Sequence, residues 1–319
     1  MKDLEFTFEP ILEPELYTTP PLMTVVVAKL TGTKRDIPRA FRLTSDIPHA
    51  DLRHLRRLRH LNDGTFECVI CKLGSEEQAG EKLEELELRF KSEAIFRDYR
   101  YTQVPSKAPK TEQQLKACNA IWPCKFAKSN HLMKCIEGSL LTEQEILVLK
   151  IIAEETVKKL EASGFSSAAV IFRFSKIYGV GLCDRKDVES HPVHHSTMLA
   201  IDSVATHAQA GHWKPTSGVD LMKVVQSRLD NQDLLTDHRI EGHFIPYLCT
   251  NYDVFVTEEP CFMCTMGLTQ SRIRRLFYLD KQSQKLCYPD KAIESHLIHR
   301  DRNLNHRFEA WKVILNARA

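Results

Sequence analysis

The spacing of hydrophobic residues in the first hundred positions predicts two strands and two helices. Largely apolar runs at 23–30 and 66–73 predict strands. Leucine recurs at every third position from 52 to 61, which predicts an amphipathic helix within 47–61. A second helix is predicted at 75–90, where Ser75 is placed to cap the first turn. This strand-helix-strand-helix order predicts a small α+β domain, for which a ferredoxin-like arrangement is one candidate.

A new hydrophobic pattern begins at 141–164, where it predicts a long amphipathic helix. Thr142 occupies the N-cap position and Glu145 follows three residues later, so that the two residues can form a capping box. Gly164 is placed to end the helix, since glycine readily adopts the left-handed conformation found there.

Beyond this helix the pattern alternates between strands and helices, as in an α/β domain. Strands are predicted at 168–174, 176–183, 252–257 and 273–279, and helices begin near His195 and Cys261. The connection at 211–246 is longer than most loops in compact domains, which is typical of functional loops. We therefore divide the chain into an N-terminal α+β domain (1–104), a linker rich in Pro and Lys (105–138), and an α/β domain (139–319).

Composition and charge restrict the classes of protein that the sequence can represent. The chain has 319 residues and a net charge of +2, so contacts with nucleic acid would depend on local basic patches. No apolar run approaches the roughly 18–20 residues of a membrane helix, and the acidic start MKDLEFTFEP is unlike a signal peptide. We therefore expect no membrane association and a location in the nucleus and cytoplasm. Thiols stay reduced there, so the ten cysteines are expected to be buried residues or metal ligands.

One histidine and two cysteines are spaced as ligands of a metal ion. Cys261 and Cys264 follow Pro260 at the predicted start of a helix, where residues three apart share a face. The positive end of the helix dipole favours the thiolate form that binds metal. His195 begins another predicted helix, and the neighbouring His194 is an alternative to it. One His and two Cys predict a Zn²⁺ site with a fourth position open to water or to another group.

These residues also carry a resemblance to a known family. The signature His-x-Glu…Pro-Cys-x-x-Cys belongs to the cytidine and tRNA adenosine deaminases. The segments PYLCTNYDVFVTEEPCFMC (246–264) and NLNHRF (303–308), with the pair Trp122–Pro123, resemble motifs of the non-catalytic subunits of eukaryotic tRNA adenosine-34 deaminases. The resemblance extends over residues 110–315 and is strongest at 246–277. It implies a cytidine-deaminase-like domain with three αβα layers and a mixed sheet.

The resemblance also implies a function and a partner. In such a heterodimer the other subunit carries the catalytic Glu and its own zinc, and the pair converts adenosine to inosine at wobble position 34 of the tRNA anticodon arm. This chain would then be a zinc-binding structural and RNA-binding subunit.

Thr197 stands where the catalytic deaminases have the glutamate that moves protons. A threonine hydroxyl does not titrate near neutral pH, so it cannot act as the general acid and base. Losing such a group typically costs about 10²–10⁴-fold in rate. Glu258 and Glu259 precede the Pro-Cys-x-x-Cys motif and are the nearest substitutes in the sequence. We predict that the chain alone is inactive, although it resembles a subunit of an enzyme.

Basic residues supply candidate contacts to RNA phosphates. The densest basic run lies in the predicted helix at 47–61, where it is also typical of a solvated helix face. The candidates are Arg53, Arg56, Arg57 and Arg59 in this run, Lys107 and Lys110 in the linker, Arg272, Arg274 and Arg275 after the predicted helix that begins near Cys261, and Arg300, Arg302 and Arg307 near the C-terminus. We predict that Phe308 and Trp311 pack against a helix and do not stack on bases.

Two other functions are compatible with the residues. A stand-alone zinc deaminase with an unconventional base would turn over substrate without a partner. A zinc-stabilised scaffold protein would have neither activity nor RNA. The resemblance favours the subunit over both.

Overall fold

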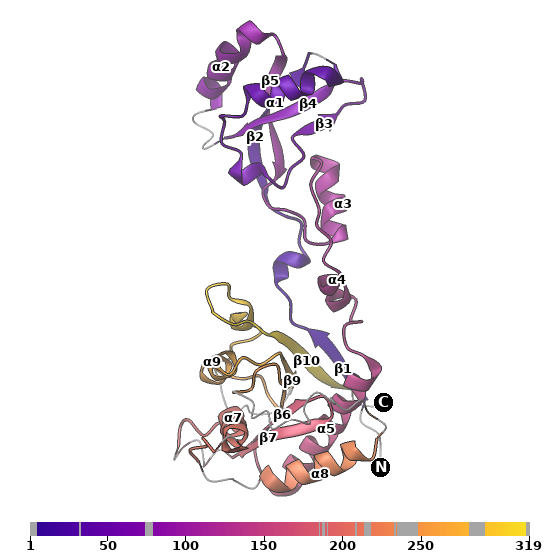
Figure 1. Cartoon of the computed structure of the whole chain (residues 1–319), viewed down its shortest axis with the longest axis vertical. Coiled ribbons are helices and arrows are strands. Elements are labelled where there is room, and N and C mark those ends of the chain that lie inside the picture. Colours follow the sequence, from indigo (N-terminus) through magenta and orange to yellow (C-terminus); the bar gives the residue numbers. More distant parts are fainter. Residues whose placement is uncertain are drawn as a thin grey trace. The chain divides into compact units, whose positions relative to one another are not determined.

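A computed structural model gives the fold (Figure 1). It describes residues 5–316 except 32, 74–78, 185, 187–188, 190, 208, 214–217, 233, 235–247 and 281–290. The chain forms two compact units, one of residues 12–133 and the other of residues 1–11 together with 134–319. In the described part of the chain, no helix is long and apolar enough to cross a membrane.

A mixed six-stranded sheet forms the centre of the larger unit. Its strands are β1 (Glu5–Pro10), β6 (Ser167–Arg173), β7 (Lys176–Cys183), β8 (Asp253–Val256), β9 (Arg275–Leu279) and β10 (Glu309–Asn316), in the order β1-β10-β9-β8-β6-β7. β8, β9 and β10 are parallel neighbours, and the other pairs are antiparallel. The four predicted strands of this unit correspond to β6, β7, β8 and β9. The outer pair of β1 and β10 was not predicted. Trp311 lies on β10, and its buried side chain belongs to the core that the sheet shares with the helices on one of its faces.

Helices cover both faces of this sheet, which gives the predicted three αβα layers (Figure 1). The helices are α5 (Glu143–Ser163), α7 (Ser196–His207), α8 (Gly218–Asp230) and α9 (Phe262–Gln270). On one face, Leu149 of α5 and Val225 of α8 share a core with Phe277 of the sheet. On the other face, Ala200 of α7 and Leu268 of α9 belong to a second core. The helix α8 lies within the connection for which no structure was predicted.

The caps predicted for α5 are present. The Thr142 hydroxyl accepts a hydrogen bond from the Glu145 N–H at 3.2 Å, and the Glu145 carboxylate accepts one from the Thr142 N–H at 2.9 Å. Gly164 ends the helix with φ +76°, and its N–H donates to the Leu160 carbonyl oxygen at 3.2 Å. These short-range signals fix both ends of the helix.

The smaller unit contains a separate four-stranded antiparallel sheet. Its elements are β2 (Leu22–Leu30), α1 (Ile37–Leu43), β3 (Leu58–His60), β4 (Phe66–Lys72), α2 (Ala79–Phe90) and β5 (Phe96–Pro105), and the strand order is β3-β4-β2-β5. This β-α-β-β-α-β succession is the one found in ferredoxin-like units. The Ser75 cap predicted for α2 lies outside the described residues.

The prediction of a helix at 47–61 is wrong. The segment forms one turn of 3₁₀ helix (Ala50–Leu52) and the short strand β3. Between them, the Arg56 N–H donates to the Pro123 carbonyl oxygen at 2.8 Å, and Leu55 forms an isolated bridge with Cys124. Contacts with a segment more than sixty residues away thus take the place of helical hydrogen bonds.

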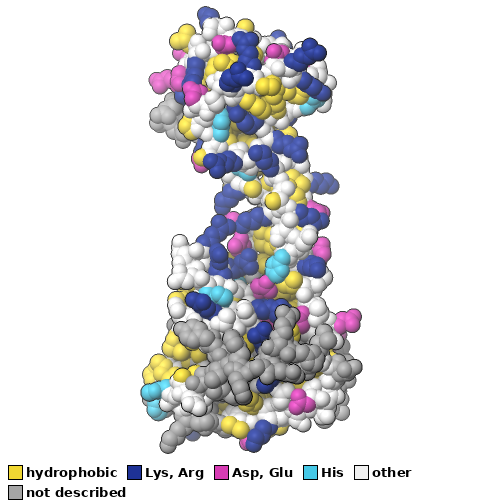
Figure 2. Space-filling model, viewed as in Figure 1, with side chains coloured by type: hydrophobic (Ala, Val, Ile, Leu, Met, Phe, Trp, Pro, Cys, Tyr) yellow, Lys and Arg dark blue, Asp and Glu magenta, His cyan; other side chains and the backbone are white. Residues whose placement is uncertain are grey.

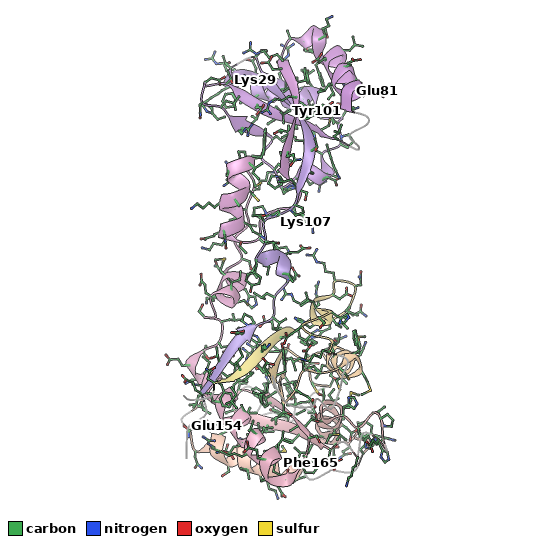
Figure 3. The ribbon with its side chains drawn as sticks, turned by 180° about the vertical axis from the view of Figure 1, so that it is seen from behind. Lys29, Glu81, Tyr101, Lys107, Glu154 and Phe165 are labelled. Atoms are coloured by element: carbon green, nitrogen blue, oxygen red, sulfur yellow. The ribbon has the colours of Figure 1, made fainter. Side chains whose placement is uncertain are left out.

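Most of the predicted linker belongs to the smaller unit. It contains α3 (Glu112–Ile121) and the start of α4 (Asn130–Ile136). Trp122 is fully buried after α3, and its indole N–H donates to the Arg56 carbonyl oxygen at 2.7 Å. Lys107, labelled in Figure 3, lies between β5 and α3. The segment after β5 is therefore packed structure over much of its length.

Candidate metal centre

Close packing of α7 on β7 positions the first residue of the site. A Cβ atom on Gly181 would lie 2.0 Å from the Ser196 carbonyl oxygen, and one on Gly179 would lie 2.5 Å from that of Ala200. Only glycine allows the helix and the strand to approach so closely. The approach places His195, directly before α7, in the interior with 9% of its surface exposed.

The two cysteines come from the start of α9. Cys261 is the N-cap residue, and Cys264 lies one turn later and is fully buried. Their Sγ atoms each lie 3.4 Å from Nδ1 of His195. Two helix starts separated widely in the sequence therefore converge on one point.

This arrangement fits a zinc ion. The three ligand atoms lie within 4.8 Å of one another. Zinc binds His nitrogen at about 2.0–2.1 Å and Cys sulfur at about 2.3 Å, distances that a tetrahedral ion could satisfy from this cluster. The rival His194 is turned elsewhere, because its ring stacks on His191 at a centroid distance of 4.5 Å and meets the edge of Trp213.

The pKa values of the two thiols are shifted in opposite directions. The hydrogen bond between the Cys264 thiol and the Cys261 sulfur, together with the nearby His195, holds the pKa of Cys261 below its ordinary value despite its burial. The same hydrogen bond, together with burial, raises the pKa of Cys264. A hydrogen bond from the Thr197 side chain opposes that rise. Thr197 is buried, and its contact is with a candidate ligand.

The two neighbouring glutamates occupy different environments. Glu259 accepts hydrogen bonds from the Ile293 and Glu294 N–H groups, both at 2.9 Å, and so holds a backbone turn. Glu258 is 5% exposed, and its charge raises the pKa of Cys264. Within the described residues, neither carboxylate joins the three-ligand group.

The arginines of the basic run separate into two groups. Arg53 and Arg56 are exposed. The Arg59 guanidinium lies 4.5 Å from the ring centroid of Trp122 and pairs with the buried Glu67 at 2.6 Å. Arg57 lies 4.7 Å from the ring centroid of Phe41. Two of the four predicted RNA contacts therefore also hold the smaller unit together.

The other predicted RNA contacts are dispersed. Lys and Arg side chains are frequent on the visible face of the smaller unit (Figure 2). Lys107 and Lys110 pair with Glu15 and Glu13. In the larger unit, Arg272, Arg274, Arg302 and Arg307 are exposed and Arg300 is half-buried. Arg275 is buried and pairs with Asp253 and Glu145.

Comparison with known proteins places the metal centre within a recognised region. Residues 142–280 match the family model described as the cytidine and deoxycytidylate deaminase zinc-binding region. This range contains His195, Cys261 and Cys264.

Full-length relatives extend the similarity. A zebrafish (Danio rerio) protein named probable inactive tRNA-specific adenosine deaminase-like protein 3 is 28% identical over 99% of this chain and 95% of its own length. The tRNA-specific adenosine deaminase subunit tad3 of Schizosaccharomyces pombe is 30% identical over 82% of this chain and 74% of its own length. Subunit TAD3 of Saccharomyces cerevisiae is 24% identical over the same two shares.

Proposed function

Because the chain belongs to the family of tRNA-specific adenosine deaminase subunits named tad3, we propose that it is the non-catalytic, zinc-binding and RNA-binding subunit of a heterodimeric deaminase. A partner subunit supplies the catalytic Glu and a second zinc, and the pair converts adenosine to inosine at position 34 of tRNA in the nucleus and cytoplasm. The observation that carries this proposal is a complete ligand cluster beside a residue that cannot move protons.

Thr197 supports the non-catalytic assignment. Its hydroxyl lies within hydrogen-bonding reach of Cys264, so it stabilises a ligand thiolate in the region where a base would act. A hydroxyl with no titration near neutral pH gives no general acid-base catalysis. The residue thus has a place in the metal centre without a catalytic role.

The metal has a structural role in this proposal. Bound by His195, Cys261 and Cys264, a zinc ion joins the starts of α7 and α9, and such sites contribute directly to folding free energy. In catalytic deaminases the metal activates a water molecule. Here it holds two helices in the positions that a partner recognises.

Apolar side chains beside the cluster are suited to the partner subunit. Phe262 and Met266 of α9 are 38% and 37% exposed, and Val193 before α7 is 48% exposed. Phe262 and Met266 are four residues apart and so share one helix face. Exposed apolar side chains on one helix face, such as Phe262 and Met266, are typical of protein interfaces.

Exposed basic residues supply the RNA contacts in this proposal. Arg53 and Arg56 in the smaller unit, and Arg272, Arg302 and Arg307 in the larger one, present charges to solvent. An A-form stem is recognised through its backbone and shape, for which such dispersed charges are suited.

The decisive assay measures inosine formation in a tRNA that carries adenosine at position 34. The chain alone, the catalytic partner alone and the co-expressed pair are compared, and the two arms that contain the chain are repeated with Thr197→Glu. We expect activity only in the pair. Zinc content and tRNA binding of the chain are measured on the same samples, since a scaffold protein without RNA would bind zinc and no tRNA.

Turnover by the chain alone would instead favour the stand-alone deaminase. The buried Glu258 near Cys264 is the observation behind that alternative. A Glu258→Gln variant would then lose the activity, whereas Glu259→Gln would act through stability because Glu259 holds the turn at Ile293.

A further inference from the structure

A cavity lies in the larger unit, at the end of the sheet opposite the candidate metal centre. It has a volume of about 530 Å³ and lies between the start of α5, the β6–β7 turn and the first residues of β8 and β9. Asp253 at the start of β8 lines the cavity, whereas Cys261 lies beyond the end of the same strand. The two sites are therefore separated by the length of a strand.

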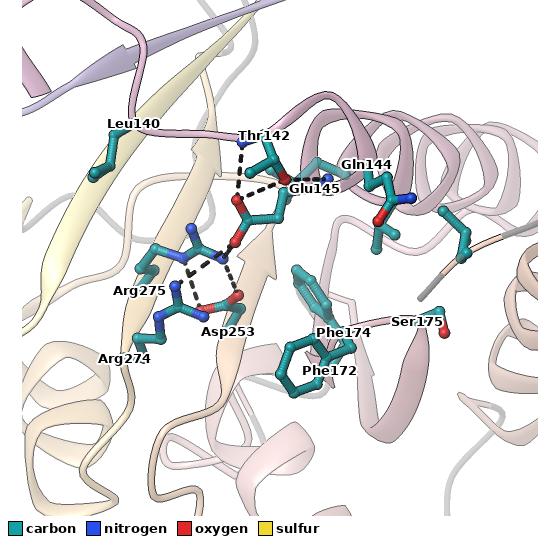
Figure 4. A pocket seen from close by; sticks show the side chains of 13 residues that line it. Leu140, Thr142, Gln144, Glu145, Phe172, Phe174, Ser175, Asp253, Arg274 and Arg275 are labelled. Atoms are coloured by element: carbon teal, nitrogen blue, oxygen red, sulfur yellow. Dashed lines mark hydrogen bonds and ion pairs between the residues drawn. The ribbon is translucent and has the colours of Figure 1, made fainter. Parts of the chain in front are cut away.

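A buried network of charges forms one wall of the cavity. The Arg275 guanidinium donates to Asp253 at 3.0 and 2.5 Å and to Glu145 at 2.7 Å (Figure 4). Glu145 also accepts hydrogen bonds at the N-cap of α5. The carboxylates of this wall are therefore largely occupied by partners within the protein. Gln144 also lines the cavity, and its side-chain amide can both donate and accept hydrogen bonds.

Arg274 lies beside this network and is the more accessible cation. Its side chain is 48% exposed, and the ion pair it makes with Glu145 is long, at 3.7 Å. Such a pair uses little of the hydrogen-bonding capacity of a guanidinium, which has five N–H donors. Arg274 can therefore bind an anionic group at the edge of the cavity.

Two phenylalanines from the β6–β7 hairpin form the aromatic wall. Phe172 is buried on β6, whereas Phe174 is 46% exposed in the turn that follows (Figure 4). The Arg173 guanidinium lies 5.5 Å from the ring centroid of Phe174. A flat ring that enters the cavity can therefore meet an exposed aromatic side chain.

The backbone of Phe174 is strained. Its φ is +52°, in the left-handed region that favours glycine and that a bulky aromatic residue rarely adopts. Phe174 and Ser175 are the two residues between the paired Arg173 and Lys176, a position where glycine would form the turn more easily. Strain of this kind is concentrated at binding sites, where the side chain serves a purpose other than stability.

We propose that this cavity binds a nucleotide, with the base against Phe172 and Phe174 and the phosphate on Arg274. Its volume accommodates a purine nucleoside monophosphate. Gln144 supplies polar contacts for the edge of the base. The same chemistry is offered by a free nucleotide and by an unpaired nucleotide of RNA. The site is separate from the candidate metal centre. With a free nucleotide as its ligand it is independent of the proposed function, whereas with a nucleotide of RNA it rests on the proposed RNA-binding role, for which Arg274 is already a candidate contact.

The test uses the full-length chain and two probes. Adenosine 5′-monophosphate is titrated by calorimetry, and a fluorescein-labelled single-stranded oligoadenylate is titrated by anisotropy. The variants are Phe174→Gly and Arg274→Gln, with Phe174→Tyr as the variant that keeps the ring. Lys223→Gln, an exposed charge on α8, is the matched control. Thermal unfolding of each variant is measured alongside.

Phe174→Gly separates an effect on binding from an effect on stability, because it relieves the left-handed strain while it removes the ring. We expect its Tm to equal or exceed that of the parent, while affinity falls by about tenfold or more for the probe that binds. Arg274→Gln should lower affinity similarly, and Phe174→Tyr and Lys223→Gln should retain it. Binding of the mononucleotide identifies a free nucleotide as the ligand, and binding of the oligonucleotide alone identifies RNA. Absence of binding by both probes, or equal binding by Phe174→Gly and its parent, would overturn the proposal.

Discussion

Nδ1 of His195 lies 3.4 Å from Sγ of Cys261, although 66 residues separate the two in the chain. Because the candidate ligands lie at the starts of two different helices, a metal ion bound between them would also stabilise the packing of those helices. We therefore expect Cys261→Ser and His195→Ala to reduce bound zinc from about one ion per chain to almost none, and to lower Tm. Metal content by mass spectrometry and thermal unfolding measure both effects.

Cys249→Ala is the matched control, because Cys249 is fully buried but lies outside the ligand cluster. It should cost stability through a small cavity and leave the zinc content unchanged. Full zinc occupancy in Cys261→Ser would show that the cluster is not the metal site.

The close approach of α7 to β7 predicts a steric effect at Gly181. In Gly181→Ala the new methyl group would meet backbone atoms of Ser196 and Ala200 at 2.0 and 2.6 Å, so the helix must shift. We expect a loss of about 1–3 kcal/mol in the free energy of unfolding, with weaker zinc binding. Gly80→Ala in the exposed part of α2 meets no atom within 4 Å and should instead gain up to about 1 kcal/mol. Chemical denaturation compares the two, and equal effects would contradict the packing argument.

The basic run of the smaller unit should separate stability from RNA affinity. Arg59→Ala removes the stacking on Trp122 and one partner of the buried Glu67, and should cost about 1–3 kcal/mol of stability. Arg53→Ala should change stability by less than about 0.5 kcal/mol, because Arg53 is exposed.

The same pair of variants tests the RNA assignment of Arg53. If this residue contacts phosphate, the slope of log affinity for tRNA against log salt should fall by about one in Arg53→Ala. Filter binding at several salt concentrations measures the slope. An unchanged slope would remove Arg53 from the RNA surface.

The charge network at the start of α5 predicts a pH dependence. Burial alone would raise the pKa of Glu145, but the Thr142 N–H and the Arg275 guanidinium outweigh it and hold the pKa below the ordinary value of 4.5. The folded state therefore binds its proton less readily than the unfolded state does. The stabilisation by Glu145 is present above pH 4.5 and is lost as the pH falls through the lower folded value.

Unfolding of Glu145→Gln and its parent, compared from about pH 3 to about pH 7, tests this expectation. The difference in stability should be constant near neutral pH and shrink in acid. Glu161→Gln makes the same charge change at an exposed position of α5. A difference for Glu145→Gln that grows in acid would reverse the assigned sign.

Local signals in the sequence were sufficient where a structure depends on neighbouring residues. Thr142, Glu145 and Gly164 predicted both ends of α5, since caps act over three or four positions. The cluster of candidate ligands was also predictable, because each of its residues lies at a helix start and is of a type that binds zinc. The residue types and their positions paired His195 with the two cysteines, and the resemblance to known deaminases agreed with that pairing.

Predictions from the sequence failed where the structure depends on residues that are far apart in the chain. The leucine spacing at 47–61 has a helical period, yet Leu52 and Leu55 pack in one core with Trp122, which lies far along the chain. No local pattern indicates that partner. The cavity beside Phe174 was missed for a related reason, because its lining comes from five separate segments and none carries a motif that indicates a binding site.

The pairing of β1 with β10 has a consequence for how the protein is made. Glu5 faces Asn316 in the sheet, so β1 is synthesised long before the strand with which it pairs. Residues 12–133 are synthesised while β1 still lacks its partner, which allows the smaller unit to fold first. The smaller unit is thus an insertion with two covalent connections to the larger one, and a single cut in the chain cannot release an intact larger unit.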